Sequence, residues 1–135
     1  MSEKPPIVLT IAGFDPSSGA GVTADIKTIA AHGCYGVACI TAMTVQSTAG
    51  VRRVEVVDPA FLSEALEELA ADLEIAAVHV GMLGSGKVVK AVAEFLSGQP
   101  AVERGDTSAN PPAAKTRFPN IVLDPILKSS SGAAL

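Results

Sequence analysis

The chain has 135 residues, of which 48% are hydrophobic and only 18% are charged, and its formal net charge is −4 at pH 7. A chain of this length makes about one domain and can bury a sizeable core. The acidic charge, one Tyr and no Trp argue against nucleic acid as a partner, because its binding proteins carry basic stripes and stacking aromatic side chains.

Membrane insertion and export are not expected either. No stretch of the sequence approaches the roughly 20 apolar residues of a transmembrane helix, and residues 1–6 lack the long apolar region of a signal peptide. Cys34 and Cys39 are too few and too close for a disulfide framework, and their spacing does not resemble a zinc pair. We therefore expect two reduced thiols in a cytoplasmic protein.

The first half of the chain alternates between apolar runs and one helix. Residues 7–12 form a short β-branched run, typical of a buried strand, and a loop rich in Gly, Ser and Pro follows. A helix is predicted over residues 21–31, closed by Gly33. Residues 37–45 are nearly all apolar, which predicts a strand covered on both faces. Residues 51–57 partly alternate and predict an exposed or edge strand.

The second half starts with a strong helix signal. Asp58 and Pro59 are typical of an N-cap and a first helical residue. A buried strand over 77–83 and an amphipathic helix over 87–96 follow. Residues 97–119 are rich in Pro, Ala, Ser and charge, and we interpret them as a flexible surface insertion. Residues 121–123 predict a further buried strand.

This alternation of strands and helices predicts an α/β fold with a largely parallel sheet flanked by helices. Ligands of such sheets bind at the carboxyl ends of the strands. The residues that directly follow predicted strands are therefore the candidates for a site: Asp15, Gln46, Met82 with Gly84, and Asp124.

The glycine-rich segment 13–21 allows several interpretations. It lacks the Lys-Ser or Lys-Thr pair of a P-loop. A dinucleotide fingerprint can be forced onto residues 19–24, but no acidic residue ends the next strand, where a ribose ligand should be. A turn that cradles a small substrate and a tight turn that needs Gly only for positive φ both remain open.

Each remaining candidate has a structural and a functional interpretation, and for a lone glutamine such as Gln46 the structural one is the usual case. The amide of Gln46 can pair with the edge of a heteroaromatic ring or can simply be solvated. Asp124 can position a metal–phosphate or a lysine, or cap the next turn. His79 lies inside an apolar run and is predicted to be a core histidine with satisfied hydrogen bonds, and Met82 by itself is predicted to fill the core.

Four segments together resemble one family. TIAGFDPSSGAGVTADIKT, HGCYGVACITAMTVQST, VHVGMLGS and IVLDPILKSSSG are similar in order and spacing to the hydroxymethylpyrimidine/phosphomethylpyrimidine kinases of thiamine biosynthesis, which are ribokinase-like enzymes. The resemblance implies ATP-dependent phosphorylation, with Mg²⁺, of 4-amino-5-hydroxymethyl-2-methylpyrimidine and then of its monophosphate. Pyridoxal kinase has the same general plan and is the alternative within the superfamily.

The resemblance also implies roles for individual residues. Gln46 and Asp25 match residues at the aminopyrimidine ring, and Gly13 and Ala20 match backbone contacts to the substrate. Three further positions match residues that line the pocket: Thr44, Met82 and Ile126. Apolar walls and a polar edge suit such a ring.

The family has a second half, with the anion hole, the catalytic base and most of the nucleotide site, and nothing in this sequence matches it before Leu135. Residues 1–135 are therefore interpreted as the N-terminal, substrate-binding half of a ribokinase-like domain that is inactive by itself. A sheet left with an open edge would invite association, including homo-oligomers. The alternative from another class is a non-catalytic module that binds a small molecule.

Overall fold

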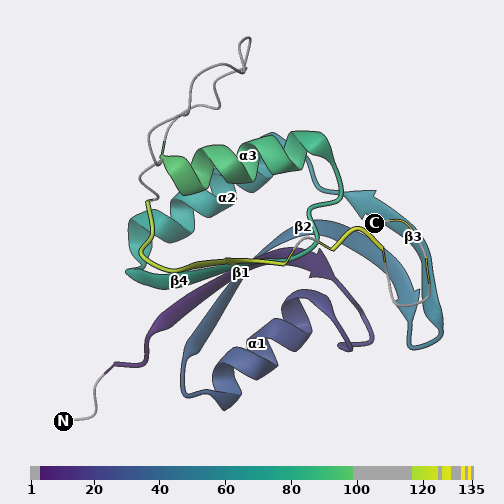
Figure 1. The fold of residues 1–135 in the computed structure, drawn as a ribbon, viewed down its shortest axis with the longest axis horizontal. Coiled ribbons are helices and arrows are strands. Elements are labelled where there is room, and N and C mark those ends of the chain that lie inside the picture. Colours follow the sequence, from purple (N-terminus) through teal and green to yellow (C-terminus); the bar gives the residue numbers. More distant parts are fainter. Residues whose placement is uncertain (1–3, 99–116, 125, 129–131, 133, 135) are drawn as a thin grey trace, which may run out of the picture.

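The computed structural model describes residues 4–98, 117–124, 126–128, 132 and 134. Within these residues the chain forms five strands and three helices, shown in Figure 1. In chain order these are β1 (Ile7–Phe14), α1 (Gly21–Ala31), β2 (Tyr35–Ser47), β3 (Gly50–Val56), α2 (Pro59–Asp72), β4 (Ile75–Val80), α3 (Gly86–Ser97) and β5 (Ile121–Leu123). The predicted order of elements is confirmed.

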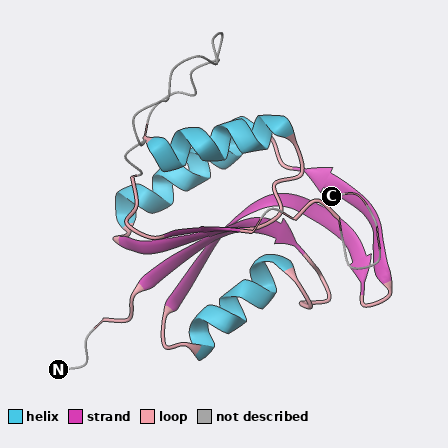
Figure 2. Cartoon of the chain, viewed as in Figure 1, coloured by secondary structure: helices cyan, strands magenta, loops and turns pink. Residues whose placement is uncertain are grey.

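The strands form one mostly parallel sheet. Its order is β3-β2-β1-β4-β5, with β1 in the centre. β1 pairs in parallel with β2 and β4, β4 pairs in parallel with β5, and only β3 runs antiparallel, as the edge partner of β2. Helix α1 covers one face of the sheet, and α2 and α3 lie together on the other (Figure 2). The predicted α/β class and flanking helices are confirmed.

The main core lies between the sheet and the α2/α3 layer. Alternate residues of a strand point to opposite faces, so Leu9 and Ile11 of β1 are fully buried in this core while Thr10 points toward α1. The core also takes in side chains from β4, α2 and α3: Val78, Val80, Leu62, Leu66, Val88, Val92 and Phe95. This packing holds the carboxyl ends of β1 and β4 in place.

The predicted start of α2 is confirmed. The Asp58 side chain accepts hydrogen bonds from the backbone N–H groups of Ala60 and Phe61, both at 3.0 Å, and Pro59 occupies the first turn. These bonds satisfy donors that the first turn of a helix cannot pair internally. No helix in the described ranges is long and apolar enough to cross a membrane.

Two strands predicted as buried are exposed in part. In β2, Met43 and Val45 are exposed because the β2–β3 hairpin extends beyond the helices. In β5, Val122 and Leu123 are 63% and 60% exposed. β5 pairs only with β4, and its other edge is open among the described residues. Apolar content predicted these strands correctly, but the predicted burial is wrong at Met43 and Val45 of β2 and at Val122 and Leu123 of β5.

The stretch predicted as a flexible insertion, 97–119, lies mostly outside the described residues. Its first residue, Ser97, ends α3. At its other end, Phe118 is buried in the core, with its ring centroid 5.2 Å from that of Phe95. Arg117 forms an ion pair with Glu67 at 2.8 Å. These last residues are therefore packed onto α2 and α3 and do not form a free surface loop.

The turn that leads from β1 into α1 depends on Gly21. Its φ of +64° lies in the left-handed region, and a Cβ there would overlap the backbone carbonyl oxygen of Gly13. Phe14 and Gly21 also form an isolated antiparallel bridge across the neck of the loop. Only a residue without a side chain allows this close approach.

We predict that Gly21→Ala lowers the free energy of unfolding by at least about 1–3 kcal/mol, because it adds left-handed strain and a backbone overlap. Urea unfolding followed by circular dichroism measures the change. The matched control is Gly86→Ala, where a Cβ meets open space. At that helical position Ala is the better helix former, so stability should stay equal or rise by up to about 1 kcal/mol. Equal stability of the two variants would contradict the assigned role of Gly21.

Candidate functional site

A cavity of about 470 Å³ opens at the carboxyl ends of the strands. Its walls come from the β1–α1 loop, the start of α1, the end of β2 and the segments that follow β4 and β5. Eight residues that the resemblance or their position after a strand predicted line it: Gly13, Ala20, Asp25, Thr44, Gln46, Met82, Asp124 and Ile126. Asp15 lines it as well, whereas Gly84, the other candidate that follows a strand, does not. The fold thus brings together four segments that are far apart in the chain.

The β1–α1 loop is built around the carboxylate of Asp15, which is only 4% exposed. Its Oδ1 accepts hydrogen bonds from the Ser17 N–H at 2.8 Å and the Ser17 hydroxyl at 2.7 Å. Its Oδ2 accepts from the N–H groups of Gly19 at 3.1 Å and Ala20 at 3.0 Å. The loop is therefore closed around a charge of its own.

These bonds decide what the glycine-rich loop can bind. Asp15 takes four N–H groups of the loop that could help to cradle a phosphate: those of Ser17, Gly19 and Ala20 through its carboxylate and that of Ser18 through its carbonyl oxygen. No side chain among the described residues caps the first turn of α1. Burial alone would raise the pKa of Asp15, but the hydrogen bonds from Ser17, Ala20 and Gly19 outweigh it and hold the pKa below its usual value. The loop is thus a wall of the cavity in which the N–H groups of residues 17–20 are already paired.

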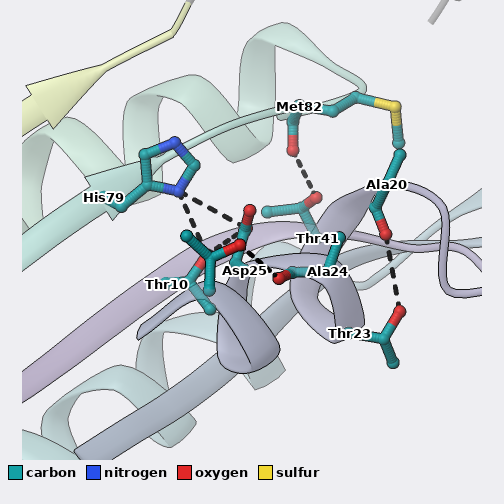
Figure 3. Close-up of polar contacts among 9 residues, drawn as sticks. Thr10, Ala20, Thr23, Ala24, Asp25, Thr41, His79 and Met82 are labelled. Atoms are coloured by element: carbon teal, nitrogen blue, oxygen red, sulfur yellow. Dashed lines mark hydrogen bonds and ion pairs between the residues drawn. The ribbon is translucent and has the colours of Figure 1, made fainter. Parts of the chain in front are cut away.

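One side of the cavity is apolar and closely packed. Met82 is 7% exposed, and its carbonyl oxygen accepts a hydrogen bond from the Thr41 hydroxyl at 2.6 Å (Figure 3). A Cβ at Gly13 would come within 2.6 Å of Met82 Cε. The missing side chain of Gly13 therefore makes room for the end of Met82 on the cavity wall.

Thr44 and Gln46 form the polar edge on β2. The Thr44 hydroxyl lies 2.8 Å from the carbonyl oxygen of Phe14 and 3.1 Å from Gln46 Oε1. Gln46 is half-buried and is held in the β2–β3 hairpin opposite Val51. Its amide nitrogen has two hydrogens to donate. The edge can therefore offer donors and acceptors to a flat heteroaromatic ligand.

Asp25 belongs to a cluster with Thr10 and His79, shown in Figure 3. The Thr10 hydroxyl donates to Asp25 Oδ2 at 2.6 Å, and His79 Nδ1 lies 3.3 Å from Thr10 Oγ1 and 3.4 Å from Asp25 Oδ2. His79 also lines the cavity, and its side chain is 31% exposed. The prediction that His79 is a core residue is wrong, although its Nδ1 does have polar partners in Thr10 and Asp25.

The sequence does contain a signal for this cluster. Thr10 and His79 are single polar residues inside apolar runs, and they face each other across β1 and β4. Only the strand pairing reveals that the two polar residues meet.

The segment after β5 closes the remaining side. The Asp124 N–H donates to the carbonyl oxygen of Val80 at 2.8 Å, which ties this exposed carboxylate to the end of β4. Lys128, which sequence reasoning did not single out, lines the cavity as well. Among the described residues, no three His, Cys, Asp or Glu side chains lie together in a way that could hold a metal ion.

A family model described as phosphomethylpyrimidine kinase matches residues 15–104. The chain belongs to the phosphomethylpyrimidine kinase family. The matched part includes the β1–α1 loop, α1, the β2–β3 hairpin and the end of β4. Of the eight predicted cavity residues, Ala20, Asp25, Thr44, Gln46 and Met82 lie inside it, while Gly13, Asp124 and Ile126 lie outside.

Curated members of the phosphomethylpyrimidine kinase family match almost all of the chain. The hydroxymethylpyrimidine/phosphomethylpyrimidine kinase of Escherichia coli K12 is 38% identical over 127 residues, which cover 94% of this chain and 41% of that enzyme. The enzyme of Aquifex aeolicus is 40% identical over 129 residues, 96% of this chain and 44% of the enzyme. The chain thus spans about two fifths of the length of these relatives.

Solved structures agree with the family assignment. The phosphomethylpyrimidine kinase of Clostridium difficile superimposes with a TM-score of 0.77 at 34% identity, over 96% of this chain and 49% of that one. A pyridoxal kinase of Staphylococcus aureus, in complex with AMP-PCP and pyridoxal, gives a TM-score of 0.70 at 26% identity, over 92% and 40%. The fold is therefore ribokinase-like, as the sequence predicted.

We predict that Asp15→Asn lowers the free energy of unfolding by about 1–3 kcal/mol, because an amide nitrogen would face N–H groups that the carboxylate now satisfies. Chemical denaturation at pH 7 measures the loss. Ser17→Ala is the matched control: it removes one hydroxyl hydrogen bond and should cost about 0.5–1.5 kcal/mol. A loss no larger for Asp15→Asn than for Ser17→Ala would refute the central role of the carboxylate.

Wild type and Asp15→Asn should also differ in how their stability depends on pH. The pKa of Asp15 is lowered in the folded state. The ionised carboxylate therefore adds its full share to the free energy of unfolding above the pH range in which free carboxyl groups titrate, and this share is lost as the pH falls through the lower pKa of the folded state. The stability difference between wild type and Asp15→Asn should therefore be constant above about pH 5 and shrink below about pH 4. A difference that grows on acidification would contradict this sign.

Proposed function

We propose that this chain forms the acceptor-substrate side of a kinase that transfers the γ-phosphate of ATP to the hydroxymethyl group of 4-amino-5-hydroxymethyl-2-methylpyrimidine and then phosphorylates the monophosphate, toward thiamine diphosphate. The observation that carries the proposal is the convergence of Asp25, Gln46 and Met82 on one cavity, in a chain of this family. The two cysteines of the chain, both free, support a cytoplasmic setting.

The cavity has the chemistry that an aminopyrimidine requires. Gln46 offers an amide to the ring edge, and Asp25 offers a carboxylate that accepts from an amino group or a protonated ring nitrogen. Met82 and Ile126 supply apolar contact for the ring faces. We assign Gly13 to a backbone contact with the substrate and Ala20 to one through its carbonyl oxygen, because the Ala20 N–H already donates to Asp15. Thr44 is assigned to the support of Gln46.

The donor side of the reaction requires ATP and Mg²⁺. Mg²⁺ usually takes one or two carboxylates together with phosphate oxygens and water, and Asp124 is the exposed carboxylate at the cavity that fits this role. Phosphoryl transfer also needs groups that position the γ-phosphate and stabilise its charge. We assign the catalytic base and the anion hole to the part of the relatives' length that this chain does not span.

The open edge of β5 is where we place the contact with that remaining part. Val122 and Leu123 are largely exposed there, and β5 has no second strand partner among the described residues. An apolar edge with unpaired backbone groups favours pairing with another strand. Residues 1–135 are then the N-terminal, substrate-binding half of a ribokinase-like domain, and association of two copies through the same edge is the competing outcome.

Ligand binding and turnover by the 135-residue chain test the proposal. Calorimetric titration should detect the hydroxymethylpyrimidine, and an assay with ATP, Mg²⁺ and this pyrimidine should show no turnover. Pyridoxal is the comparison ligand, because a pyridoxal kinase has the same fold. Binding of pyridoxal without binding of the pyrimidine would overturn the substrate assignment. Turnover by the chain alone would overturn the assignment of the base and anion hole to other residues.

We predict that Gln46→Ala weakens binding of the pyrimidine by about 1–3 kcal/mol, through the loss of one or two hydrogen bonds to the ring. Titration calorimetry of both proteins measures the difference. Ser47→Ala on the neighbouring exposed position of β2 is the matched control and should leave the affinity unchanged. Unchanged affinity in Gln46→Ala would remove Gln46 from the binding site.

A further inference from the structure

The hydrogen bonds of Thr10 and Asp25 determine which nitrogen of His79 carries the proton. Thr10 has one hydroxyl hydrogen and donates it to Asp25 Oδ2 at 2.6 Å, so toward His79 its oxygen offers only lone pairs. The carboxylate of Asp25 likewise only accepts. Since His79 Nδ1 lies 3.3 Å from the first oxygen and 3.4 Å from the second, it must carry a hydrogen to interact with either.

We propose that His79 is a positioning residue of the cavity: its Nδ1–H holds the Asp25 carboxylate in place, and a second proton on Nε2 offsets the negative charge that Asp25 presents to a ligand. The ligand half of this proposal rests on the proposed function. It names His79 as the residue through which pyrimidine binding depends on pH.

The placement of His79 supports a functional effect. Its side chain and that of Asp25 are 31% and 23% exposed and line the same cavity. Burial at this level leaves the ring open to solvent protons and strengthens its interaction with the carboxylate relative to bulk water.

The other ionisable groups that line the cavity are Asp25, Asp15, Asp124 and Lys128. Asp25 on α1 is the carboxylate that pairs with His79, while Thr10 on β1 is uncharged. Asp15 is saturated by hydrogen bonds from its own loop. Asp124 and Lys128, after β5, line the cavity with opposite charges. Within the described residues, Asp25 is the ion-pair partner of His79, so the charge of His79 acts first on Asp25.

The tautomer can be measured without any ligand. Long-range ¹H–¹⁵N spectra of the 135-residue chain at pH 8 should show His79 as the Nδ1–H form, and Asp25→Asn should change the His79 signals. The chain has two histidines, so His79→Asn assigns them, and His32, whose Nδ1 lies 2.8 Å from the Thr28 carbonyl oxygen, serves as internal control. An Nε2–H tautomer at His79 would overturn the proposal.

Binding of the hydroxymethylpyrimidine at pH 8 and pH 5.5 tests the consequence for the ligand. Wild type should bind about fivefold or more weakly at pH 5.5, the lower end of typical coupling between two sites. His79→Asn places an amide nitrogen where Nδ1 stands but does not titrate, so at pH 8 it should bind more tightly than His79→Leu, and it should lose the extra weakening at pH 5.5.

Two further variants separate positioning from a purely structural role. His79→Leu removes the donor and should weaken binding at both pH values, while His32→Asn should keep the wild-type dependence on pH. A pH dependence in His79→Asn equal to that of wild type would overturn the proposal. If the wild-type chain binds no pyrimidine at either pH, the proposed function fails, and the imidazole spectrum still decides the hydrogen bond between His79 and Asp25.

Discussion

The carboxylate of Asp15 is the interaction on which the cavity depends. A loop with several glycines has a high cost of ordering, and its N–H groups would lack partners if they were buried beside the end of β1. Asp15 satisfies those of Ser17, Gly19 and Ala20 within a few residues of itself. The loop can therefore stay rigid with no ligand bound, and it sets where α1 begins.

The position of α1 in turn sets the chemistry of the cavity floor, the cluster of Thr10, Asp25 and His79. Because α1 starts directly at the neck of this loop, Asp25 comes to lie over Thr10 of β1 and beside His79 of β4. Two of these side chains come from neighbouring strands of the sheet, and the third comes from the helix that covers this face. The other face carries the apolar core with α2 and α3, so stability and ligand chemistry are largely separated on the two sides of β1.

Local signals in the sequence predicted the elements well, because caps, glycine stops and apolar runs act over a few residues. Gln46 and Asp124 were found because they directly follow predicted strands, although β2 in fact continues through Gln46 to Ser47. The family resemblance was needed to give Asp25 a role at the ring. His79 was misjudged because its role depends on which residue of β1 lies beside it. Exposure of Val122 and Leu123 was missed because an apolar run looks the same whether or not another part of a protein covers it.

The strand order has a consequence for how this part of the molecule folds. Thr10 and His79 are 69 residues apart, whereas Asp15 and its partners are separated by at most five. Contacts between distant residues pay a larger entropic cost of loop closure and slow the search for the native pairing. The β1–α1 loop can therefore form early from its own residues, while the cavity floor has to wait until β4 docks beside β1.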